Sequence, residues 1–230
     1  MTPLERLNQR LRRTLPMARL EVLPLPGCEQ IRLALINPDF PTGPLPPEVM
    51  SAVIAEPAYW AFCWGSGLGL ARVLLDHPQT VSGRHVLDLG SGSGVAGIAA
   101  ALAGAARVTA CDLDADACLA SEVNAALNDV QMQVVDDLQA VTEPVDLVLM
   151  ADVLYDRANL PLLDLAAGLG GDVLVADSRI RDLGRVDFEQ TGSLEALTFP
   201  NLGEFDEFRT VQLFSRPRTA ARQSPRSAPS

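Results

Sequence analysis

From Gly83 onward, short apolar runs alternate with longer segments of helical length. Short continuous runs of this kind are typical of strands that are buried on both faces. Strands are predicted at His85–Leu89, Arg107–Cys111, Met132–Val135, Asp146–Met150 and Asp172–Ala176. Helices are predicted at Val95–Ala103, Asp114–Asn128 and Leu160–Gly168. Alternating strands and helices indicate right-handed crossovers and a parallel sheet.

The alternation fades beyond Arg185, where Leu194–Phe199 and Arg209–Phe214 are expected to form a closing hairpin. The fold class is therefore predicted to be α/β: a Rossmann-like, mostly parallel seven-strand sheet with helices on both faces and an antiparallel C-terminal hairpin. We divide the chain into an N-terminal extension at 1–48, the α/β domain at 49–215, and a disordered tail rich in Arg, Pro and Ser at 216–230.

Prolines interrupt residues 1–48 so often that most of this stretch is expected to be irregular. A peripheral amphipathic helix over Met1–Leu15 and a short strand over Glu29–Ile36 are the expected exceptions. Two further helices are predicted at Pro47–Ala55 and Leu68–Leu75, the first because proline suits the opening turn of a helix.

Composition narrows the class of protein. Apolar residues make up 48% of the 230 residues, which suffices for a core, and the net charge of −11 weighs against binding nucleic acid. No segment is long and apolar enough to span a membrane, and no apolar stretch follows the arginines of the first residues, so we expect no secretory signal. The four cysteines show no metal-ligand spacing, so we expect no metal site and buried thiols in a reducing cytoplasm.

A glycine-rich motif follows the first predicted strand and precedes a helix. Its glycines permit sharp turns and close approach of a ligand to the backbone, and the helix N-terminus offers free N–H groups. The candidate residues are Asp88, Gly90, Ser91, Gly92 and Gly94. The Gly-x-Gly-x-x-Gly spacing alone would suit NAD equally well.

The carboxylate of Asp88 distinguishes NAD from a second candidate cofactor, S-adenosyl-L-methionine. It would repel a diphosphate but attract the cationic amino-acid end of S-adenosyl-L-methionine; the alternative is a carboxylate that caps a helix or loop. Asp112, after the second strand, is expected to accept the ribose hydroxyls, with Leu113 under the adenine. Asp137, in the Asp136-Asp137 pair, either accepts from the adenine amine or lies in a solvated turn.

Two further motifs give the chain a family resemblance. The segment Tyr59-Trp60-Ala61-Phe62-Cys63-Trp64 and the segment Asp152-Val153-Leu154-Tyr155-Asp156, together with the glycine motif, resemble the seven-strand methyltransferases. They are most similar to the protein-lysine methyltransferase group that includes the electron-transfer-flavoprotein β-subunit enzyme. Cys63 and Leu154 replace aromatic residues of that group. The resemblance implies that residues 49–215 are a methyltransferase domain.

The resemblance also implies roles for individual residues. Asp152 would orient the accepting amine and Tyr155 would line its channel; these are the catalytic candidates. Trp64 is expected beside both cofactor and acceptor, whereas Trp60 is expected in the core. The implied function is methyl transfer to a protein lysine on a basic loop, on the electron-transfer flavoprotein β-subunit or a similar protein. Alternatives are a small-molecule N-methyltransferase acting on a nicotinamide-like amine, an NAD-dependent oxidoreductase, and a silent binding module.

Overall fold

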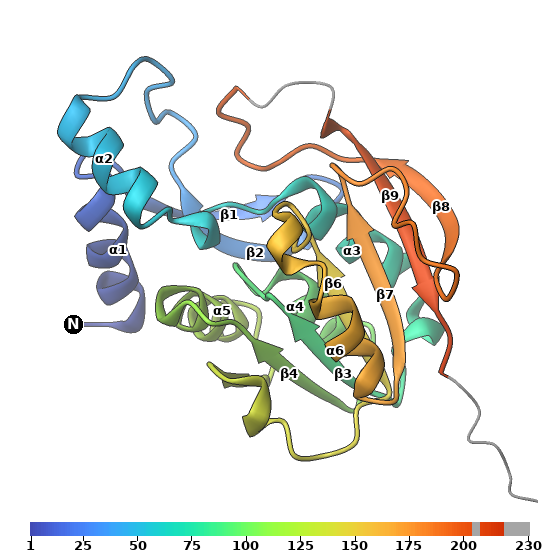
Figure 1. Ribbon diagram of the computed structural model, residues 1–230. Helices are drawn as coiled ribbons and strands as arrows, with labels where there is room; N and C mark the ends of the chain where they lie inside the picture. The colour runs from blue at the N-terminus through green and yellow to red at the C-terminus, as the bar shows by residue number, and fades with distance from the viewer. Residues whose placement is uncertain (204–207, 219–230) are drawn as a thin grey trace, which may run out of the picture.

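The computed structural model describes residues 1–203 and 208–218. Its central sheet has the strand order β5-β4-β3-β6-β7-β9-β8 (Figure 1). The strands are β3 (His85–Leu89), β4 (Arg107–Cys111), β5 (Gln133–Val135), β6 (Leu147–Ala151), β7 (Asp172–Asp177), β8 (Glu189–Glu195) and β9 (Thr210–Arg216). The first five in this order are parallel, and β9 is antiparallel to both of its neighbours. The predicted fold class is confirmed.

Helices cover the two faces of the sheet. One apolar cluster joins α3 (Gly65–Asp76) and α4 (Val95–Leu102) to one face, through residues such as Val86 and Leu149. The other cluster joins α6 (Leu162–Gly168) to the opposite face, through residues such as Leu87 and Met150. Alternate residues of β3 and β6 therefore belong to different clusters, as expected for strands buried on both sides.

The N-terminal segment is far more regular than its prolines suggest. It contains α1 (Pro3–Thr14) and an antiparallel hairpin of β1 (Leu20–Leu25) and β2 (Cys28–Ile36). Pro24 lies in β1, an edge strand, where a missing N–H is tolerated. The hairpin forms a two-stranded sheet of its own, and Ile31, Leu33 and Leu35 of β2 belong to the apolar cluster of α3 and α4. The prediction of a largely irregular segment is wrong.

The C-terminal hairpin exists, but its first strand is displaced. The sequence places it at Leu194–Phe199, whereas β8 runs over Glu189–Glu195. This edge strand is polar and mostly exposed, so its pattern did not stand out. The more apolar residues that follow leave the sheet, and Phe199 pairs with Cys63 next to α3. Of the predicted tail, residues 219–230 lie outside the described part, and Arg216 still belongs to β9.

Among the described residues, no helix has both the length and the apolar character needed to cross a membrane.

Candidate functional site

Five parallel strands end at the same edge of the sheet. Leu89 at the end of β3 lies opposite Cys111 of β4, and Ala151 at the end of β6 lies opposite Ala176 of β7. Residues that directly follow these positions therefore meet at one edge, where open α/β sheets bind ligands. The predicted residues near strands β3, β4 and β6 are Asp88, Asp112 and Asp152.

The loop from Gly90 to Gly94 turns sharply between β3 and α4. Its three glycines have φ of +74°, +52° and +79° in order, a region that L side chains rarely adopt. Gly90 has a second constraint, since a Cβ there would lie 2.7 Å from Cγ2 of Val153. Gly94 is the N-cap of α4, so the loop brings the start of that helix to the sheet edge.

Helix α5 (Ala115–Leu127) holds this loop from outside. The Ser91 and Ser121 hydroxyls lie 3.0 Å apart, and the Asn124 amide donates to the Ser93 carbonyl at 2.8 Å. The Asn124 carbonyl oxygen also accepts from the N–H of Ala34 in β2. Neither Ser121 nor Asn124 was predicted from the sequence, where the available signal was a pair of polar residues at helical spacing within an Ala-rich helix.

Asp112 connects the loop to the end of β4. One carboxylate oxygen accepts from the N–H of Gly92 at 2.8 Å, and the other accepts from the N–H of Asp114 at 3.0 Å. Burial raises the pKa of this carboxyl above its ordinary value. The neighbouring Leu113 is 88% exposed. Asp112 thus offers a fixed hydrogen-bond acceptor and Leu113 an uncovered apolar side chain, which suit the hydroxyls and the base of a nucleoside.

Asp88 is bound to the first turn of α4. Its side chain is 2% exposed and accepts from the N–H of Gly97, in the first turn of α4, at 2.8 Å. Burial raises its pKa to about 7. The geometry provides the alternative weighed from the sequence, a carboxylate bound to a helix N-terminus, and contact of Asp88 with a cationic ligand stays a prediction.

Asp137 follows β5 but stays in the solvent. It caps the short 3-10 helix η3 (Leu138–Ala140) by accepting from the N–H of Gln139 at 2.8 Å. This is the turn role that the sequence left open. The hydrogen bonds of the described residues do not join Asp137 to Asp112 or to the glycine loop.

Asp152 is clamped between two serines. Its carboxylate accepts from the Ser66 hydroxyl at 2.6 Å, from the Ser66 N–H at 2.9 Å, and from the Ser178 hydroxyl at 3.0 Å. Ser66 lies in the first turn of α3, where free N–H groups favour a negative charge. Asp152 itself has φ of +52°, a strained conformation that clusters at functional sites. The sequence identified Asp152 but neither serine.

An aromatic cluster lies beside this clamp. The Tyr59 ring, in the 3-10 helix η1 (Tyr59–Ala61), is centred 5.8 Å from the ring of Trp64 and 5.5 Å from that of Tyr155. The Trp64 indole N–H donates to the Tyr59 carbonyl at 2.8 Å. Trp60 is 2% exposed and belongs to the core, as predicted. The structure thus brings Trp64 and Tyr155 together through Tyr59, a residue of the family motif to which the sequence assigned no role.

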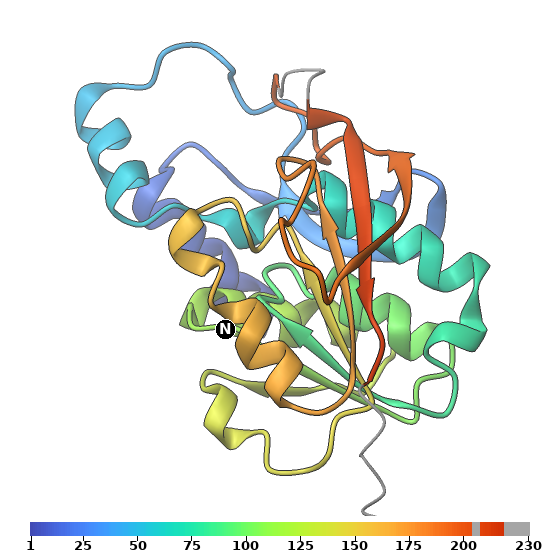
Figure 2. The same cartoon turned by 45° about the vertical axis from the view of Figure 1, so that its right-hand side comes forward.

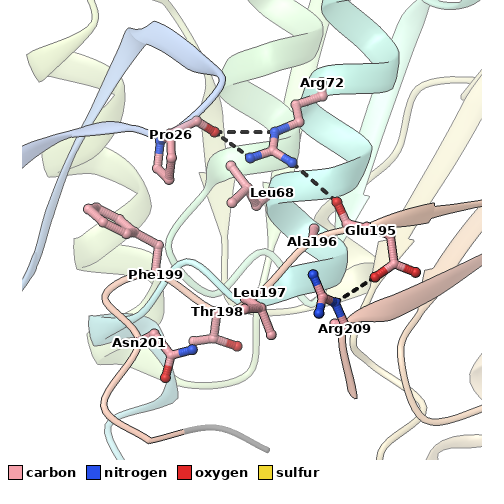
Figure 3. A pocket seen from close by; sticks show the side chains of 10 residues that line it. All are labelled: Pro26, Leu68, Arg72, Glu195, Ala196, Leu197, Thr198, Phe199, Asn201 and Arg209. Carbon is pink, nitrogen blue, oxygen red and sulfur yellow. Dashed lines mark hydrogen bonds and ion pairs between the residues drawn. The ribbon is translucent and has the colours of Figure 1, made fainter. Parts of the chain in front are cut away.

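Two hollows open on the described surface. One, of about 490 Å³, lies between α1, the segment from Glu56 to Trp60, and the residues from Leu113 to Asp116, and so borders the nucleoside-type site. The other, of about 310 Å³, lies beside α3 (Figure 3). Its Arg72 donates to the carbonyls of Pro26 and Glu195, and its Arg209 pairs with the Glu195 carboxylate. None of the predicted site residues lines this second hollow.

The fold is shared with known methyltransferase structures. The 16S rRNA methyltransferase (RsmC) of T. thermophilus, in complex with AdoMet and guanosine, aligns with a TM-score of 0.54 at 20% identity, covering 87% of this chain and 51% of that one. TrmN from Thermus thermophilus aligns with a TM-score of 0.51 at 21% identity, covering 67% of this chain and 50% of that one. These two methyltransferases therefore share the Rossmann-like fold of this chain.

Sequence similarity is narrower. The family model for ribosomal protein L11 methyltransferase (PrmA) matches residues 73–162. The chain is 39% identical over 145 residues to the electron transfer flavoprotein beta subunit lysine methyltransferase of Danio rerio, covering 57% of this chain and 52% of that protein. The Xenopus laevis protein of the same name is 38% identical over 141 residues, covering 60% and 56%. The resemblance read from the motifs is confirmed, and the chain spans about half the length of these relatives.

Proposed function

We propose that this protein transfers a methyl group from S-adenosyl-L-methionine to the side-chain amine of a lysine in another protein. The observation that carries the proposal is the clamped Asp152 beside the cluster of Tyr59, Trp64 and Tyr155, at the sheet edge that holds the glycine loop. The names of the similar proteins support a protein lysine over a small amine as acceptor, and the electron transfer flavoprotein β-subunit or a similar basic loop as its source.

The residues present fit this cofactor on one side of the site. The loop from Gly90 to Gly94 would hold its amino-acid part, Asp112 would accept from the ribose hydroxyls, and Leu113 would pack against the adenine. When bound, the cofactor supplies an electrophilic methyl group whose bond to sulfur breaks as the carbon–nitrogen bond forms. The glycines matter here because only a bare backbone lets a ligand lie directly on the loop.

The aromatic side would receive the amine. An approaching lysine is a cation, since its ordinary pKa is about 10.4. The faces of Tyr59, Trp64 and Tyr155 suit a cation, and the Asp152 carboxylate attracts it. Attack requires the neutral amine, and burial among aromatic rings lowers the pKa of a lysine. Asp152 therefore aims the amine first, and accepts its proton second, directly or through water.

We also propose that the protein works in the cytoplasm. The chain has four cysteines, all free thiols and three of them buried, which supports a reducing compartment. The net charge of −11 supports a basic protein surface as partner and disfavours nucleic acid.

The decisive experiment incubates the purified protein with tritiated S-adenosyl-L-methionine and purified electron transfer flavoprotein, and in parallel with nicotinamide. Because this chain contains no lysine, any methyl-lysine recovered after hydrolysis comes from the acceptor. Label on lysine of the flavoprotein β-subunit is the expected result. Label in nicotinamide alone would identify a small-molecule enzyme instead. Absence of transfer combined with tight NAD binding would overturn the proposal altogether.

A further inference from the structure

Helix α2 (Pro47–Ala55) is apolar but contains no buried residue. Its inner side, with Val49 and Val53, is partly buried against the cluster that includes Trp60. Its outer side carries Met50, 42% exposed, and Ile54, 74% exposed. These two residues are four positions apart and so lie on one face of the helix. Figures 1 and 2 both show α2 at the outside of the molecule, away from the sheet.

The chain runs from this helix directly into the aromatic side of the site. Ile54 is followed within five residues by Tyr59, which is 46% exposed and whose ring contacts that of Tyr155, itself 51% exposed. The hollow of about 490 Å³ starts at Glu56, immediately after α2. Several large apolar side chains exposed within one segment of the chain are typical of a surface that binds another protein.

The charge of the same segment limits what can bind there. Residues 40–71 contain only two charged side chains, Glu48 and Glu56, and no basic one. Both glutamates are exposed, one in the first turn of α2 and one at its C-cap. A face of apolar residues flanked by carboxylates is complementary to a segment that carries apolar and basic residues together, although the adjoining hollow also contains Arg10 and Arg13 of α1.

We infer that the outer face of α2, formed by Met50 and Ile54, is the docking surface for the methyl-accepting protein. This inference rests on the proposed function and adds to it how the acceptor is held. A lysine that reaches the aromatic cluster on its aliphatic stem keeps its own backbone close to the mouth of the site. The neighbouring residues of that acceptor must then lie against the surface around Tyr59, of which the outer face of α2 is the apolar continuation.

The test separates docking from catalysis. Ile54→Glu places a third carboxylate on the face, and Val186→Glu is the matched control. Val186 is fully exposed in the connection between β7 and β8, next to Asp187. Asp187 pairs with Arg216, and Arg216 lies opposite Val173 near the start of β7. The candidate site lies where the parallel strands end, so the control lies toward the other end of the strands. Each variant is measured for direct binding to purified electron transfer flavoprotein by calorimetry, and for binding of S-adenosyl-L-methionine.

We expect Ile54→Glu to raise the Kd for the flavoprotein at least about tenfold, because a buried interface residue becomes charged. Its Kd for the cofactor and its thermal midpoint should match those of Val186→Glu and the wild type. Methylation of a short lysine peptide should also be unchanged, since a peptide does not span α2. Met50→Glu, one helical turn away, should reproduce the loss.

Three results would overturn the docking surface. One is wild-type affinity in Ile54→Glu; another is equal loss in Val186→Glu; the third is a change of sedimentation with concentration in the wild type that Ile54→Glu abolishes, which would make this face a contact between two copies. If the wild type binds the flavoprotein through this face but transfers no methyl group to it, the docking surface stands and the proposed function fails.

Discussion

The two sides of the sheet edge are built in different ways. The glycine-loop side, Gly90–Gly94 with Asp112, comes from a single strand–loop–helix–strand unit, and backbone N–H groups fix its carboxylate. The aromatic side, with Tyr59, Trp64, Asp152 and Tyr155, comes from segments about 90 residues apart, and serine hydroxyls together with the N–H groups of the same serines fix its carboxylate. A local unit tolerates change elsewhere in the chain, whereas the aromatic side depends on how distant elements pack. We therefore expect substitutions on the two sides to separate cofactor binding from transfer.

The largest separation is expected for Asp152→Ala. Removing the carboxylate that aims the amine should lower kcat about a hundredfold or more, because positioning and proton transfer are lost together. Cofactor affinity, measured by titration calorimetry, should stay within about twofold, since Asp152 contacts Ser66 and Ser178 and not the glycine loop. Unchanged turnover would remove Asp152 from the reaction.

The opposite pattern is expected for Asp112→Ala. Loss of a charged acceptor of hydrogen bonds costs about 1.5–3 kcal/mol, so the Kd for S-adenosyl-L-methionine should rise about 10- to 100-fold. At saturating cofactor, kcat should recover to near the wild-type value. If kcat falls in both Asp112→Ala and Asp152→Ala while affinity is unchanged in both, the division between the two sides is wrong.

On the glycine-loop side, the sequence predicted the positions of the strands and the loop well, but it did not predict the environment of the Asp88 carboxylate. Strand ends and turn residues follow from local patterns, so β3, β4 and the glycine loop that follows β3 were predicted with their bounds. The position of Asp88 did not follow, because a carboxylate in this motif can turn toward the ligand or toward the helix. Packing decides between these, since α4 offers the N–H of Gly97.

The aromatic side shows the complementary limit. Its conspicuous residues, Trp64 and Tyr155, were identified by motif, but the clamp on Asp152 was not. Ser66 and Ser178 are ordinary residues in the sequence and become significant only when the start of α3 meets the end of β7. The strand β8 was misplaced for a related reason, because an exposed edge strand lacks the apolar pattern of a buried one.

The buried state of Asp88 gives a test by pH. Its pKa of about 7 in the folded protein exceeds the ordinary value of 3.8, so between these values the folded state binds more protons than the unfolded state. Stability must then fall as pH rises through this window, by at most about 1.4 kcal/mol per pH unit. Asp88→Asn keeps the hydrogen bond to Gly97 without titrating.

The measurement is urea unfolding of the wild type and Asp88→Asn between about pH 5 and pH 7. Groups that titrate in both proteins cancel in the difference, which isolates Asp88. The stability of Asp88→Asn relative to the wild type should increase with pH. A constant difference would place Asp88 in a more polar environment, closer to the ligand-facing position that the sequence first suggested.

The smallest change in kcat is expected for substitutions of Ser178 and Ser66, the two serines that bind Asp152. Ser178→Ala removes one hydroxyl from Asp152 and should lower kcat roughly fivefold, the value of about 1 kcal/mol for one hydrogen bond. Ser66→Ala should lower it less, because the N–H of Ser66 still donates to the other carboxylate oxygen at 2.9 Å, whereas the N–H of Ser178 lies 3.4 Å from the carboxylate. Ser178→Thr, which keeps the hydroxyl, is the control and should restore most of the rate. Loss of cofactor affinity in Ser178→Ala would contradict the assignment, because it would mean that the clamp also shapes the glycine-loop side.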